Sequence, residues 1–127
     1  MAEQLCELKK KGGGAMTETV LWTNPSPTAT FVQQSISLPD LLSYKYLKFY
    51  LRDSTSDSTS WSAIFNITDM SSKGMPLGQA LDSASKTHYR GTQTLSGTSL
   101  TIRNCYQVNG TGTNNSLVIP IKISGLK

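Results

Sequence analysis

Few residues in this sequence could carry acid–base or nucleophilic chemistry. A nucleophilic mechanism needs a serine or cysteine, a base within reach and a third group that orients the base. His88, in the segment KTHYRG, is the only histidine, and no serine lies in a G-x-S-x-G turn. Cys105, next to Tyr106, has the pattern of a small core residue. We therefore predict no catalytic residue, and the alternative of a small hydrolase rests on His88 and the many hydroxyls alone.

Carboxylates and metal ligands are equally sparse. Four aspartates fall in predicted loops: Asp53, Asp57, Asp69 and Asp82. The segment DSTSD at 53–57 lacks the central glycine and the closing glutamate of a calcium loop. The two cysteines, Cys6 and Cys105, belong to different predicted units, so we expect neither a disulfide nor a zinc site. The sequence predicts no metal and no cofactor.

Aromatic residues among hydroxyls are the remaining candidates for binding. An aromatic ring can stack on the apolar face of a sugar while polar groups around it form hydrogen bonds. The candidate glycan-contact residues are Tyr50, Arg52, Trp61, Tyr89 and Arg90. The alternative for Trp61, as for Trp22, is that the indole fills the core, and we favour that interpretation for both.

The elements that must position these residues are β-strands. From residue 19 onward apolar residues recur with a period near two, and turn signals separate the runs about every ten residues, as in all-β sandwiches and barrels. The predicted strands are 19–23, 28–38, 44–52, 60–68, 86–93, 99–108 and 116–124. In the third strand, Leu47, Phe49 and Leu51 should face the core, and Tyr46, Lys48, Tyr50 and Arg52 should face outward.

Three connecting features complete this pattern. Pro120 cannot donate to a ladder, so the last strand should lie at an edge or contain a bulge. The segment 69–85 is the longest irregular stretch and is expected to be mobile or functional. The segment LWTNPSPTATF at 21–31 favours a corner between strands over a polyproline ligand, because strand pattern lies on both sides of its prolines.

The N-terminal segment differs from the rest of the chain. Met1, Leu5 and Leu8 fall on one face of a short predicted helix, and Gly12 ends it. A helix of this length is unstable alone in water, so we expect the segment to become ordered only by docking. Its candidate anchoring residues are Met1, Leu5, Cys6, Leu8, Lys9, Lys10 and Lys11. The predicted domains are an anchoring arm with its glycine linker, 1–16, and an antiparallel, jelly-roll-like β-sandwich, 17–127.

Charge and hydropathy exclude several classes of partner. The net charge is +4 and the basic residues are scattered apart from the run at 9–11, so we expect no nucleic-acid binding. No apolar run is long enough to cross a membrane, and the N-terminus lacks the apolar region of a signal peptide. We expect a product made in the cytosol, unless a larger assembly carries it out.

The arm, LWTNPSPTATF, the strand LKFYLR and the closing SLVIPIKISGLK together resemble small β-sandwich virion proteins of phages and prophages of gut Firmicutes, which are head-fibre, decoration or tail-tip components. The resemblance implies a non-enzymatic structural protein of the virion, assembled in the bacterial cytoplasm and anchored to capsid or tail proteins by its arm. Homo-oligomers, including trimers, and adhesion to host-surface glycans are the expected partnerships. The alternative is a free-standing carbohydrate-binding domain.

Overall fold

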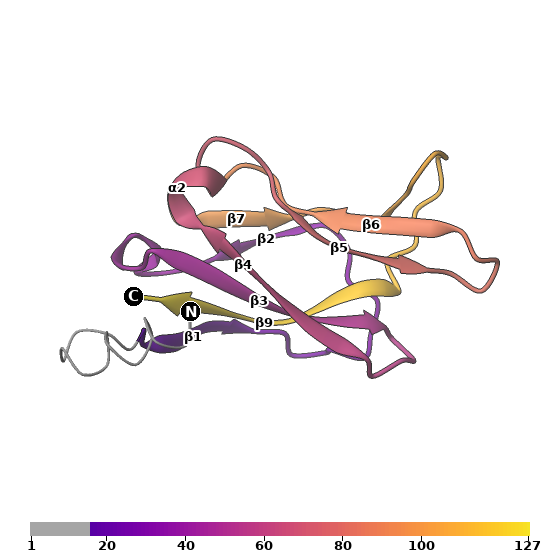
Figure 1. Ribbon diagram of the computed structural model, residues 1–127, viewed down its shortest axis with the longest axis horizontal. Helices are drawn as coiled ribbons and strands as arrows, with labels where there is room; N and C mark the ends of the chain where they lie inside the picture. Colours follow the sequence, from indigo (N-terminus) through magenta and orange to yellow (C-terminus); the bar gives the residue numbers. More distant parts are fainter. Residues whose placement is uncertain (1–15) are drawn as a thin grey trace, which may run out of the picture.

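The computed structural model describes residues 16–127, which form nine β-strands and two short helical turns (Figure 1). The candidate anchoring residues, Met1 through Lys11, lie outside the described residues. In chain order the elements are β1 (Glu18–Thr23), β2 (Gln34–Ser37), η1 (Leu41–Ser43), β3 (Tyr46–Ser54), β4 (Ser60–Asn66), α2 (Ile67–Met70), β5 (Pro76–Leu81), β6 (Thr87–Gly91), β7 (Ser99–Ile102), β8 (Tyr106–Gln107) and β9 (Leu117–Leu126).

The strands are arranged in two antiparallel layers (Figure 1). One layer is a four-stranded sheet in the order β1-β9-β3-β4. The other combines the pair β2-β7 with the sheet β5-β6-β8, because a bridge from Thr92 to Ile102 and a 2.9 Å hydrogen bond from the Arg103 amide to the Gly91 carbonyl connect β6 to β7. The predicted all-β class with antiparallel sheets is confirmed, and the arrangement is consistent with a β-sandwich.

The core lies between the layers and follows the period of two along β3. Leu47, Phe49 and Leu51 are fully buried, and the residues between them are half-buried on the outer face, as the alternation predicts. Phe49 meets Phe65 of β4 edge to face, with ring centroids 5.8 Å apart. Leu100 of β7 belongs to the same buried cluster from the other layer. Burial of these side chains holds the outer face of β3 in a fixed orientation.

Several predicted strands have different bounds. The predicted strand 28–38 is regular only at β2, because a turn hydrogen bond joins Ala29 to Ser26 and the Phe31 amide donates to the Asn115 carbonyl instead of to a strand. The predicted strand 99–108 is divided into β7 and β8, because the Cys105 amide donates to the Asn115 side chain at 2.9 Å. The segment 69–85 was predicted to be irregular, but it contains the six-residue strand β5.

The last strand has a central position that the sequence did not predict. β9 pairs with β1 on one side and with β3 on the other, so the edge position proposed for Pro120 is wrong. The proposed irregularity is present, because the register moves from Tyr50–Lys122 to Leu51–Pro120 and leaves Ile121 as the extra residue of a bulge.

The segment 21–31 forms a corner, as predicted. Asn24 is 7% exposed and its amide donates to the Ile121 carbonyl at 2.8 Å. Its side-chain Nδ2 donates to the Pro120 carbonyl at 2.8 Å, and its Oδ1 accepts from the Ser26 amide at 2.8 Å. The side chain thus fixes the corner against β9 at a carbonyl that β1 does not reach.

Replacing Asn24 by alanine should lower the free energy of unfolding by about 1–3 kcal/mol, because the buried Pro120 carbonyl loses its donor. Urea denaturation of the full chain measures the loss. Thr28→Ala, at an exposed position of the same corner, is the control and should change stability by less than about 0.5 kcal/mol. Equal stability of the two variants would show that the corner is held without this side chain.

Candidate functional site

The outer face of the four-stranded sheet carries a group of charged and aromatic side chains that we call the lysine–tyrosine cluster: Glu18, Lys48, Tyr50 and Lys122. Lys48 and Tyr50 face outward because they alternate with the buried residues of β3. Lys122 lies directly opposite Tyr50 on β9, and Glu18 lies at the start of β1. Three strands distant in sequence therefore supply one cluster.

Tyr50 is the centre of this cluster. The Nζ atoms of Lys48 and Lys122 lie 4.7 Å and 4.4 Å from the centroid of its ring, within the range of cation–π interaction. Its hydroxyl donates a hydrogen bond to Glu18 Oε2, and Lys48 Nζ lies 3.9 Å from Glu18 Oε1. The tyrosine thus has two ammonium groups within 5 Å of its ring centroid and is itself oriented by a carboxylate.

An open groove of about 420 Å³ runs beside the cluster. It is lined by Lys48, Tyr50, Ser60, Trp61, Ser62, Ile121 and Lys122. Lys122, Tyr50 and Ser62 form one row across β9, β3 and β4, because each is the direct partner of the next in the strand register. The groove therefore offers two cations and two serine residues along one wall of the sheet.

Contacts within the cluster favour the charged forms of Glu18 and Lys48. The Tyr50 hydrogen bond, followed by Ser124 and the two lysines, holds the pKa of Glu18 below its usual value against the opposing effect of partial burial. The interaction with Tyr50, supported by Glu18, raises the pKa of Lys48. Two ammonium groups and one carboxylate leave this small area with an excess positive charge, so it can attract an anion.

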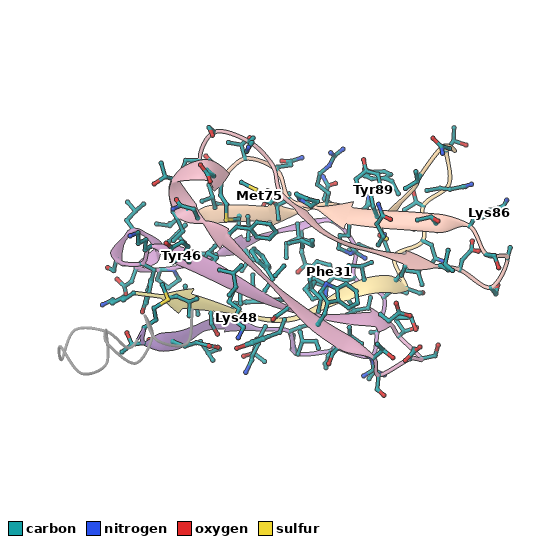
Figure 2. All side chains as sticks on the ribbon, viewed as in Figure 1. Phe31, Tyr46, Lys48, Met75, Lys86 and Tyr89 are labelled. Carbon is teal, nitrogen blue, oxygen red and sulfur yellow. The ribbon has the colours of Figure 1, made fainter. Side chains whose placement is uncertain are left out.

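The predicted contact residues do not form one surface. Tyr50 and Arg52 lie on the outer face of β3, whereas Tyr89 lies on β6 of the other layer, 37% exposed and paired with Gln79 and Tyr106 (Figure 2). Arg52 Nε donates to the carbonyls of Ser54 and Asp57 at 2.9 Å and 3.0 Å. Arg52 therefore fixes the turn after β3, and Tyr89 lies on the opposite side of the molecule.

Trp61 belongs to the core side of its strand, as the alternative interpretation held. It is the direct partner of the buried Leu51 and packs against the hydrophobic core. Its Nε1 donates to the Leu77 carbonyl at 3.2 Å, and the indole covers Gly78 so closely that an added Cβ would lie 2.5 Å from Cζ2. The indole thus joins β4 to β5, and the half-buried ring also lines the groove beside the cluster.

Arg90 was predicted at the surface, but its side chain is fully buried, with 0% exposed. The alternation along β6 places Tyr89 outside and Arg90 inside. Its Nε donates to the Val118 carbonyl at 2.7 Å, its Nη1 to the Arg103 carbonyl at 2.7 Å, and its Nη2 to the carbonyls of Leu117 and Asn115 at 3.1 Å and 3.4 Å. This arginine binds backbone of its own chain and is not available to a ligand.

The surroundings of Arg90 are mostly uncharged. Its guanidinium lies 5.4 Å from the Phe31 ring centroid. Burial lowers its pKa to about 10, so the group stays protonated at neutral pH. Burial also raises the pKa of Cys105 to about 11, which makes that thiol a poor nucleophile. Val118, which accepts from Nε, has φ of 50°, a rare conformation for a β-branched residue.

His88 is also buried, on the inner face of β6, and its Nδ1 lies 3.2 Å from the Lys86 carbonyl. That position agrees with its interpretation as a structural residue. Within residues 16–127 no group of three His, Cys, Asp or Glu side chains is placed to hold a metal ion. In the same part of the chain, no helix has the length and hydropathy needed to cross a membrane.

Sequence reasoning did not select Glu18, Lys48 or Lys122 as site residues. The outward position of Lys48 was predictable from the alternation along its strand. Its neighbours were not, because the pairing of β9 between β1 and β3 brings residues 18 and 122 to it from opposite ends of the described chain.

The comparisons with known proteins provide no relative. The chain matches no protein-family model, no curated protein and no solved structure.

Proposed function

We propose that this chain is a non-enzymatic structural protein of a phage virion, displayed as a head-fibre, decoration or tail-tip module that adheres to host-surface glycans. In this proposal residues 17–127 are a jelly-roll-like β-sandwich and residues 1–16 attach it to capsid or tail proteins. The observation that carries the adhesive role is the groove beside the lysine–tyrosine cluster on an open sheet face. The virion context is carried by the sequence resemblance.

The place where the arm joins the sandwich supports separate attachment and adhesion surfaces. The Lys127 amide donates to the Thr17 carbonyl at 3.2 Å, so the start of the described chain and its C-terminus lie together at one end of the layers. The groove is formed further along the sheet, by the middle of β3 and β9. A module attached to the particle at the end that holds Thr17 would leave the groove exposed. Display in many copies would convert weak single contacts into strong total adhesion.

Deletion of residues 2–14 should remove the protein from purified particles while the rest of the chain remains folded. The reason is that the proposed attachment lies entirely in the arm, whereas strands β1 to β9 and the core between them come from residues 16–127. Immunoblotting of gradient-purified particles measures incorporation, and circular dichroism of the purified variant monitors the fold. Incorporation at the level of the intact chain would contradict the anchoring role.

The second candidate, a free-standing carbohydrate-binding domain, uses the same groove without a particle. It is favoured if the intact protein remains in the soluble fraction when particles are sedimented and still binds glycans on an array. Light scattering of the purified chain tests the accompanying proposal of a homo-oligomer, of which a trimer is one form.

A further inference from the structure

We infer that the ligand of the groove beside the lysine–tyrosine cluster is a negatively charged polysaccharide. This inference rests on the proposed adhesive function and names the class of ligand for that surface. The negative charge on the sugar could be a carboxylate, a sulfate or a phosphate. A lysine ammonium group is a compact charge that can donate hydrogen bonds to any of these three groups.

The ring and the hydroxyl of Tyr50 already have partners within the protein. Two ammonium groups lie within 5 Å of its centroid, and its hydroxyl donates to Glu18. A neutral sugar that stacked on this ring would compete with these cation–π contacts. The groove consequently presents cations, and a tyrosine that was predicted to be a stacking platform acts as their support.

The local balance of charge is a further argument. Glu18 is the one carboxylate of the cluster, and it forms its ion pair with Lys48. Lys122 lies on the Tyr50 ring, and no salt bridge joins it to an acidic group in residues 16–127. A ligand anion near Lys122 would add a favourable interaction without breaking an existing ion pair.

Further lysines lie at the end of the sheet. Lys45 Nζ lies 5.7 Å from the ring centroid of Tyr46, which is the outward residue that precedes Lys48 on β3. Lys127 Nζ lies 5.2 Å from that of Tyr44, and both lysines line a second open hollow, of about 490 Å³, at the end of the sheet. These lysines add positive charge at the end of the sheet, which raises the local concentration of an anionic polymer.

The chemistry of the groove favours a polysaccharide over a nucleic acid. Single-stranded nucleic acids bind through aromatic faces that stack with bases. Of the aromatic residues that line the groove, Tyr50 has two ammonium groups over its ring, and Trp61 is half-buried and packs against the core. Ser60 and Ser62 are exposed on the groove wall, where their hydroxyls can exchange hydrogen bonds with those of a sugar. Arg52, the nearest arginine on β3, donates to backbone carbonyls.

The test uses two polymers with one backbone, dextran sulfate and unmodified dextran, and measures binding of the full chain by biolayer interferometry. The variant K48Q/K122Q should bind dextran sulfate about tenfold more weakly, since each exposed charge contact contributes up to about 1 kcal/mol and 1.4 kcal/mol corresponds to a factor of ten. The control K73Q/K86Q removes the same charge from exposed positions outside the groove and should change affinity by about twofold at most.

Glu18→Gln should change the affinity for dextran sulfate in the opposite direction, although it lies in the same cluster. The amide oxygen can still accept from the Tyr50 hydroxyl, but the competing negative charge is gone, so dextran sulfate should bind about two- to threefold more tightly. Urea midpoints of all variants show whether the fold is intact.

Three results would overturn the inference. They are equal losses in K48Q/K122Q and K73Q/K86Q, binding of unmodified dextran as strong as that of dextran sulfate, and tighter binding of a single-stranded oligonucleotide than of the sulfated polymer. These measurements use purified protein without particles. A negative result in these binding measurements therefore says nothing about particle incorporation. Conversely, the result of the incorporation experiment says nothing about the class of ligand.

Discussion

Replacement of Arg90 by methionine is expected to lower the free energy of unfolding by about 3–5 kcal/mol, a large part of the total stability of a domain this size. Methionine fills much of the volume of the arginine stem but donates no hydrogen bond. The carbonyls of Arg103, Asn115, Leu117 and Val118 would then lose a donor inside the protein. Urea denaturation monitored by fluorescence of the two tryptophans measures the loss.

Arg90→Lys separates the charge from the geometry of the guanidinium. Lysine keeps a positive charge but has one nitrogen, which cannot reach carbonyls on both sides that now bind Nε, Nη1 and Nη2. We expect Arg90→Lys to lose more than half as much stability as Arg90→Met. Arg103→Met, which removes a half-buried guanidinium over the Tyr106 ring, is the control and should cost about 1 kcal/mol or less. A methionine variant as stable as the intact chain would show that the carbonyls find other donors.

The contact between Trp61 and Gly78 gives the second large effect. Gly78→Ala should lower the free energy of unfolding by about 1–3 kcal/mol, because the new Cβ would lie 2.5 Å from the indole and either β5 or the ring must move. Trp61→Leu should cost a similar amount, because it removes the indole from the core and the donor from the Leu77 carbonyl.

The double variant makes this prediction specific. In the Trp61→Leu chain the space above Gly78 is open, so the further change Gly78→Ala should cost less than about 0.5 kcal/mol. Additive losses would show that the added methyl group strains β5 independently of the indole.

Periodicity alone was enough to predict the class of the fold and the two faces of β3, because alternation is a local property of the chain. It was not enough for β5, where Pro76 and Gly78 interrupt the strand pattern and serine-rich turns surround it. It also could not decide which of Tyr89 and Arg90 faces inward, since a shift of one residue exchanges the faces of a strand. A buried arginine without a carboxylate partner among the described residues is rare enough that composition argues against it.

The lysine–tyrosine cluster was missed for a different reason. Each of its residues has an ordinary local pattern, and only the register of three strands brings them together. Strand pairing at separations of this kind depends on the packing of the whole core, which no local motif records. The sequence therefore predicted a binding surface of aromatic and basic residues. Of the residues that it named, Tyr50 belongs to the cluster and Trp61 lines the groove beside it.

The central place of β9 has a consequence for how the protein is made. During synthesis β1, β3 and β4 are complete long before β9, yet β1 and β3 have no contact in the sheet except through it. The nascent chain must therefore keep two incomplete strand edges apart until residue 126 has been translated. A premature stop within the codons for residues 117–126 would leave both edges open to other chains, so such products should aggregate instead of folding into a shortened domain.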